Sequence, residues 1–132
     1  MRSVTVRRII ANIELGQPGA VRAFYADLFG LETLMDQGWI VTLGSGATQP
    51  VQISFASEGG SGTPVPGLSI EVDDLDTVLA RAAALGIKPH YGPVVEPWGV
   101  RRAFLTDPAG TVLNVLEHTG VDPARSADLE ID

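Results

Sequence analysis

Apolar residues alternate with polar ones at the start of the chain and then recur at helical spacing. The alternation predicts a strand over residues 8–15, and the helical spacing predicts a helix over 20–31 that Gly30 ends. The same order, a strand followed by a helix, recurs at residues 67–72 and 76–87. This repetition predicts two equivalent modules whose matching positions face one shared cavity.

Shorter runs of alternating and β-branched residues predict the other strands, with turn residues between them. In the first half these strands span 32–35, 39–43 and 51–56; in the second half they span 101–105 and 111–117 around an Asp107–Gly110 turn. The expected divisions are a first module at 4–57, a Gly/Pro/Ser linker at 58–66, a second module at 67–118 and an acidic flexible tail at 119–132.

Composition limits the function before any motif is considered. The chain has 132 residues, no cysteine and a net charge of −7, so it lacks the basic face that nucleic-acid binding requires. No run reaches the roughly 18 apolar residues of a membrane helix, and the start lacks the apolar stretch of a signal peptide. We therefore expect a cytoplasmic protein with no membrane or nucleic-acid partner. The excess of acidic side chains either keeps the protein soluble or attracts a cationic ligand.

Four short motifs, in this order and spacing, resemble the vicinal oxygen chelate superfamily. That group includes glyoxalase I, bleomycin-resistance proteins and extradiol dioxygenases, and the segment with Arg101 and Arg102 is similar to its bleomycin-resistance-like branch. The motifs are Phe24–Leu31, Ile70–Asp76, Glu96–Arg102 and Asp107–Gly110. The resemblance covers about residues 8–118. It implies an α+β fold of paired βαβββ modules, with a cup-shaped mixed sheet, helices on its outer face and a homodimer.

The resemblance also assigns positions to the metal ligands of metal-using members. These positions hold Ile10, Gln52, Gly67 and Asn114 here, and a slip along the first strand would exchange Ile10 for Asn12. A divalent ion needs about three carboxylate or imidazole donors to offset its dehydration, and none stands at these positions. We therefore expect no metal and no cofactor.

If the ligand positions face the cup, their neighbours two residues away face it as well. This places the carboxylates of Glu14 and Glu71 inside as candidate acid and base, unless they lie solvated at the rim or pair with Arg101 or Arg102. Aromatic side chains such as Trp39, Trp98, Tyr91 and Phe55 either line the cup or pack in the core. The candidate ligand-binding residues are Asn12, Glu14, Trp39, Gln52, Glu71, Trp98, Arg101 and Asn114.

These features favour a protein that binds a small molecule, such as an antibiotic, without a catalytic metal. The alternative is a lyase, isomerase or dioxygenase of the same superfamily, which is either metal-free through Glu14 or Glu71 or uses displaced metal ligands. A module that binds a partner protein is a third possibility.

Overall fold

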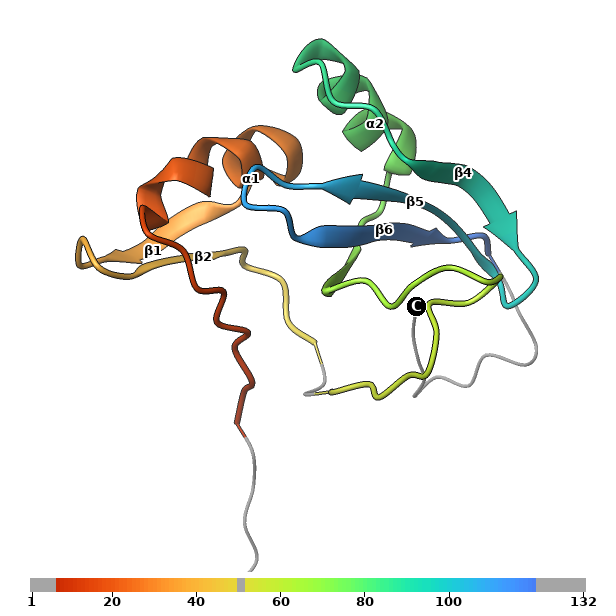
Figure 1. Ribbon diagram of the computed structural model, residues 1–132, viewed down its shortest axis with the longest axis horizontal. Helices are drawn as coiled ribbons and strands as arrows, with labels where there is room; N and C mark the ends of the chain where they lie inside the picture. The colour runs from red at the N-terminus through yellow and green to blue at the C-terminus, as the bar shows by residue number, and fades with distance from the viewer. Residues whose placement is uncertain (1–6, 50–51, 121–132) are drawn as a thin grey trace, which may run out of the picture.

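The computed structural model describes residues 7–49 and 52–120. Its elements fall into two groups along the chain, each with a helix that is followed by strands (Figure 1). They are η1 (Pro18–Val21), α1 (Arg22–Phe29), β1 (Glu32–Asp36), β2 (Val41–Gly44), β3 (Leu68–Glu71), α2 (Leu75–Ala84), β4 (Tyr91–Glu96), β5 (Val100–Thr106) and β6 (Val112–His118).

The second module forms a four-stranded sheet in the order β3-β6-β5-β4. β3 runs parallel to β6, while β5 runs antiparallel to both of its neighbours. The helix α2 crosses from β3 to β4 and lies over one face of this sheet (Figure 1). The predicted turn joins β5 to β6, with the Gly110 N–H donating to the Asp107 carbonyl over 3.0 Å.

Both predicted helices are present, and each has the end that the sequence indicates. Asp74 caps α2, because its side chain accepts a hydrogen bond from the Thr77 N–H over 3.1 Å. Gly30 ends α1 in the left-handed region, at φ 66°, which glycine adopts without steric cost.

The two helices share one hydrophobic core with the sheet of the second module. Side chains of α1 and α2 pack together with those of β5 and β6 that point toward the helices. The buried members are Phe24, Tyr25, Leu28, Leu75, Val78, Ala82, Leu105, Leu113 and Val115. Helices packed against one face of a sheet confirm the α+β class that the resemblance implies.

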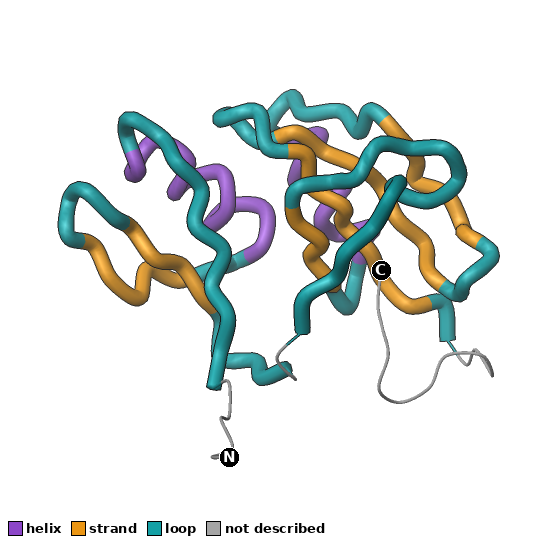
Figure 2. Tube along the Cα trace, turned by 60° about the horizontal axis from the view of Figure 1, so that its bottom comes forward, coloured by secondary structure: helices purple, strands orange, loops and turns teal. Residues whose placement is uncertain are grey.

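Two predicted strands are wrong in this chain. Residues 7–15 and 52–56 run without ladder hydrogen bonds, and Figure 2 shows them as loop. Ile10 and Phe55 are 50% and 89% exposed. A strand needs a neighbour to satisfy its backbone groups, and among the described residues β1 and β2 pair only with each other. The first module therefore contributes a hairpin, and the sheet is not continuous across the two modules.

No helix in the described part of the chain is long and apolar enough to cross a membrane. Residues 4–6, the start of the 51–56 strand and most of the expected tail lie outside the described residues.

Candidate functional site

A cavity of about 540 Å³ lies between the modules. Its walls come from the segment before η1, from η1, α1 and the β1–β2 hairpin, and from the start of β3 and the β5–β6 turn. This volume falls in the usual range for small-molecule sites, and most of the lining residues are apolar. The polar side chains of Asn12 and Glu14 and the indole of Trp39 are part of the lining.

A buried hydrogen bond joins the two modules at this cavity. The Tyr25 hydroxyl donates to Asp107 Oδ2 over 2.6 Å, and both residues line the cavity. The other carboxylate oxygen accepts the N–H groups of Ala109 and Thr111 over 2.8 and 2.9 Å. Burial, with the hydrogen bond and the charge of Asp107, raises the pKa of the Tyr25 phenol far above its usual range. Tyr25 therefore stays a donor and fixes α1 against the β5–β6 turn.

We call the sheet face opposite α2 the inner face. It carries polar and apolar side chains together. The strand registers place its members side by side. They are Ser69, Glu71, Tyr91, Val94, Glu96, Val100, Arg102, Phe104, Asn114, Leu116 and His118.

Asn114 and the Glu71–His118 pair lie at the β3–β6 side of the inner face. Asn114 is fully buried, and its Nδ2 donates to Ser69 Oγ over 3.0 Å, while its Oδ1 has no hydrogen-bond partner among the described residues. His118 Nδ1 lies 2.7 Å from Glu71 Oε2. Glu71 and Ser69 also border a smaller cavity of about 410 Å³.

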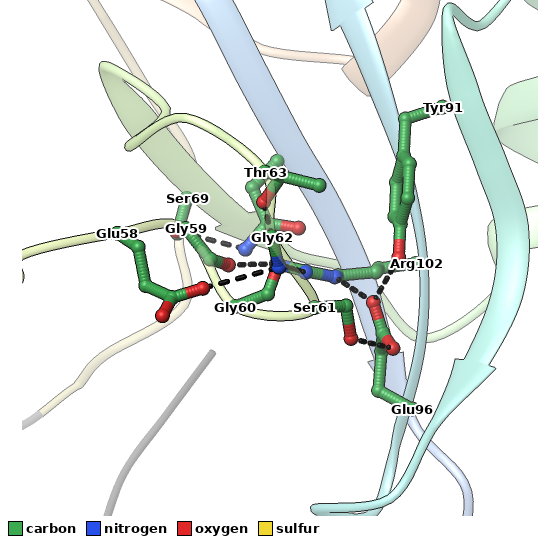
Figure 3. A network of polar contacts seen from close by, with 11 residues as sticks. Glu58, Gly59, Gly60, Ser61, Gly62, Thr63, Ser69, Tyr91, Glu96 and Arg102 are labelled. Atoms are coloured by element: carbon green, nitrogen blue, oxygen red, sulfur yellow. Dashed lines mark hydrogen bonds and ion pairs between the residues drawn. The ribbon is translucent and has the colours of Figure 1, made fainter.

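Arg102 is the centre of a buried network on the β4–β5 side of the inner face (Figure 3). Its side chain is 1% exposed, and its Nε donates to Glu96 Oε2 over 2.7 Å. The guanidinium carbon lies 4.9 Å from the ring centre of Trp98 and 5.4 Å from that of Tyr91. The opposite charge and the aromatic rings offset the cost of burying the cation.

Glu96 is the anionic partner in this network. Burial alone would raise the pKa of its carboxyl, but hydrogen bonds from Tyr91, Ser61 and Arg102, with the charge of Arg102, hold that pKa below its ordinary value. The Tyr91 and Ser61 hydroxyls each donate over 2.7 Å. Glu96 is therefore ionised at neutral pH.

The eight predicted ligand-binding residues fall into several places. Asn12, Glu14 and Trp39 line the larger cavity together. Glu71 borders the smaller cavity, Asn114 lies in the inner face, and Trp98 packs against Arg102. Gln52 is exposed and lines neither of these cavities. Whether any of them binds a ligand stays a prediction.

Arg101 and Arg102 point to opposite faces of β5. Arg101 lies on the α2 side, where its Nη2 donates to Asp76 Oδ1 over 2.8 Å and its Nη1 to Glu117 Oε2 over 3.4 Å. Arg102 is therefore the arginine of the inner face. The sequence carried a signal for this, because a hairpin centred on Asp107–Gly110 pairs Arg102 with Leu116, two residues from Asn114.

The positions of the superfamily's metal ligands do not fit a metal ion. Ile10 and Gly67 have no side-chain donor, and Gln52 and Asn114 have only neutral carboxamides. Among residues 7–49 and 52–120, no group of three or more histidine, aspartate or glutamate side chains is arranged to hold a metal.

Sequence reasoning missed the Tyr25–Asp107 and Arg102–Glu96 contacts. Helical spacing indicates a buried position for Tyr25, and Glu96 belongs to the Glu96–Arg102 motif. Both contacts join residues from different elements, and Tyr25 and Asp107 lie 82 positions apart in the chain. Only the packing of α1 against the turn brings this pair together.

A model of the Glyoxalase/Bleomycin resistance protein/Dioxygenase superfamily matches residues 15–115. No match is found among curated proteins. Among solved structures, the antibiotic binding protein TnmS3 from Streptomyces sp. CB03234 is 22% identical, with a TM-score of 0.66 over 89% of this chain and 99% of that chain.

Two other solved structures extend this likeness. A lactoylglutathione lyase from Agrobacterium tumefaciens is 28% identical, with a TM-score of 0.52 over 76% of this chain and 84% of that one. TioX from Micromonospora sp. ML1 is 19% identical, with a TM-score of 0.56 over 87% of this chain and 98% of that one.

Proposed function

Because the chain belongs to the Glyoxalase/Bleomycin resistance protein/Dioxygenase superfamily, we propose that it binds a small molecule without a catalytic metal. The observation that carries this proposal is the cavity of about 540 Å³ that both modules line. A mostly apolar wall with a few polar groups is typical of a ligand site. The likeness to an antibiotic binding protein supports an antibiotic-type ligand.

The cavity favours a ligand with a flat apolar part and a cationic group. Trp39 offers an aromatic face for stacking or cation–π contact, since its side chain is 77% exposed. Glu14 supplies a carboxylate, and Asn12 supplies both a donor and an acceptor. The net charge of −7 adds long-range attraction for a cation.

Calorimetric titration with metal-free bleomycin, a basic glycopeptide antibiotic, tests this proposal. We expect saturable binding that weakens about tenfold in Glu14→Gln, which removes one charge partner. Glu32→Gln is the matched control, because Glu32 is exposed on β1 and does not line the cavity. Absence of binding at high micromolar bleomycin contradicts an antibiotic-binding role, and equal weakening in both variants contradicts the cavity as the site.

We also propose that the protein works as a homodimer in the cytoplasm. The support comes from the two extended segments whose apolar side chains face solvent in one chain. Ile9, Ile53 and Phe55 are 49%, 65% and 89% exposed and do not line the larger cavity. Apolar side chains and unpaired backbone of this kind are typical of a surface that a second chain covers. Light scattering tests the mass, and 13.9 kDa at micromolar concentration contradicts the dimer.

The alternative proposal is an enzyme that uses the Glu71–His118 pair. A carboxylate that binds Nδ1 of a histidine orients the ring and leaves Nε2 for proton transfer. The likeness to a lactoylglutathione lyase suggests the assay, which is lactoylglutathione formation from methylglyoxal and glutathione. Turnover that Glu71→Gln abolishes supports a lyase, whereas no turnover with or without added nickel or zinc supports the binding role.

A further inference from the structure

The carboxylate of Asp107 is buried at the wall of the larger cavity, where β5 turns into β6. The residue is 5% exposed, yet it lines the cavity together with Tyr25 of α1, which lies beside this turn in Figure 1. No lysine, arginine or histidine of the described residues lines the cavity, and none of the ion pairs among residues 7–49 and 52–120 includes Asp107. The cavity wall therefore holds a negative charge that no cation of the described chain neutralises.

The hydrogen bonds of Asp107 leave one acceptor position open. Oδ1 accepts the N–H groups of Ala109 and Thr111, and Oδ2 accepts the hydroxyl of Tyr25. An ionised carboxylate has about four acceptor positions, two on each oxygen. The open position is therefore on Oδ2, the oxygen that is bonded to a side chain of the cavity wall.

The burial of Asp107 makes its charge act more strongly on a ligand than the charge of Glu14. Glu14 lines the same cavity but is exposed, so water and salt screen its carboxylate. Asp107 lies in surroundings of lower dielectric constant, where an opposite charge is attracted more strongly. Neutral donors alone hold it at present, and a donor that also carries positive charge forms the stronger hydrogen bond.

We propose that Asp107 is the residue that determines charge specificity in the larger cavity, and that its Oδ2 accepts a hydrogen bond from a primary ammonium or amidinium group of an otherwise apolar ligand. This role rests on the proposed small-molecule function and names the chemical group that the cavity selects. A quaternary ammonium group carries the same charge without an N–H. It can lie against the face of Trp39, but it cannot donate to Asp107.

Three naphthalene compounds of similar shape test this role in the unmodified chain by NMR titration. They are 2-naphthylmethylamine, with charge and N–H groups, 2-naphthalenemethanol, without charge, and trimethyl(2-naphthylmethyl)ammonium, with charge and no N–H. We expect the amine to bind about tenfold more tightly than the alcohol and about fivefold more tightly than the quaternary ion. Equal affinity of the amine and either of the other two compounds overturns the proposal.

Asp107→Asn removes the charge and keeps an oxygen that can accept the two turn N–H groups. We expect the affinity for the amine to fall about tenfold, while the affinity for the alcohol changes by less than about twofold. Asp27→Asn is the matched control, because Asp27 is exposed on α1 and does not line the cavity. Equal loss of amine affinity in the two variants overturns the proposal.

Tyr25→Phe separates charge recognition from a structural role of the same contact. The variant keeps the carboxylate but removes the donor to Oδ2, so the amine should bind about threefold more tightly even though the fold is less stable. Weaker amine binding in both Tyr25→Phe and Asp107→Asn would mean that the contact only shapes the cavity, and it overturns the proposal. If Asp107→Asn does not melt cooperatively, the three compounds on the unmodified chain decide.

The outcome with bleomycin is separate from these measurements. Bleomycin binding without a preference for the amine over the alcohol overturns the role of Asp107 and leaves the proposed function in place. A preference for the amine that depends on Asp107, found without bleomycin binding, supports the role of Asp107 and contradicts only the antibiotic.

Discussion

Both modules carry a helix that is followed by an antiparallel strand pair, yet only the second also has a strand ahead of its helix and completes a four-stranded sheet. The second module covers one face of four paired strands with α2, and residues 58–63 lie on the inner face. In the described part of the first module, β1 pairs only with β2, and the flanking segments form no strand and are mostly exposed. The difference shows that an alternating pattern specifies a face to be buried, while a strand also needs a partner for its backbone.

We expect the largest effect of a single substitution on stability in the second module, at the buried ion pair. Glu96→Gln leaves Arg102 without its negative partner inside the protein. We expect a loss of about 3–5 kcal/mol in the free energy of unfolding, measured by urea denaturation. Asp76→Asn, which removes a carboxylate from the exposed partner of Arg101, is the matched control and should cost less than about 1 kcal/mol. Equal losses would contradict the difference between the two arginines.

The same pair predicts how stability depends on pH. Because the pKa of Glu96 is lowered in the folded chain, its contribution is fully present above the ordinary pKa of the carboxyl and is lost as the pH falls through the folded value. Stability of the native chain should therefore fall on acidification from pH 5 to lower pH. In Glu96→Gln this fall should be shallower, and identical slopes in the two proteins would contradict the assigned shift.

The shared core gives the next largest effect. Leu113 is fully buried on β6, between the sheet and the helices, and Leu113→Ala should cost about 2–5 kcal/mol through lost burial and a cavity. Leu34 on β1 is 63% exposed, and Leu34→Ala should change stability by less than about 0.5 kcal/mol. A large loss in Leu34→Ala would show that the hairpin of the first module is buried in the working protein.

The hydrogen bond between the modules has an intermediate effect. Tyr25→Phe keeps the ring in the core but removes the donor to Asp107, so it should cost about 1.5–3 kcal/mol in thermal or urea unfolding. The loss should be accompanied by faster amide exchange in α1, because this bond fixes the helix against the β5–β6 turn. An unchanged unfolding free energy would mean that the modules are held by apolar packing alone.

The smallest effect on stability is expected at the exposed segment of the first module. Phe55 is 89% exposed, so Phe55→Ser should change the free energy of unfolding of a single chain by less than about 0.5 kcal/mol. If a second copy covers this segment, the same change weakens the dimer, and light scattering at a fixed concentration should show more of the 13.9 kDa chain. A dimer insensitive to Phe55→Ser would place its interface elsewhere.

The sequence predicted the parts of the fold that local patterns determine. The spacing of Phe24, Tyr25 and Leu28 gave the buried face of α1, and the turn at Asp107–Gly110 gave the last hairpin. It failed at residues 8–15 and 52–56, where the pattern is that of a strand but no other described segment pairs with it. An alternating pattern indicates which face of a strand can be buried. Whether the strand pairs depends on where the folded chain places a neighbouring strand.

The candidate site could be predicted only in part for a related reason. Asn12 and Glu14 both line the larger cavity, but so do all the residues from 10 to 15, because this segment forms no strand with two distinct faces. The sequence pattern could not group Trp98, Arg102 and residues 58–63, because their contact depends on how the chain folds back over the inner face. Residues 43 positions apart in the chain meet there with no periodic signal.

Native mass spectrometry of the chelator-treated protein with metal-free bleomycin tests the central claim most directly. The account predicts a complex whose mass equals protein plus antibiotic with no metal, formed in the presence of the chelator and reduced in Glu14→Gln. A complex that appears only when a transition metal is restored, with the metal counted in its mass, would contradict it.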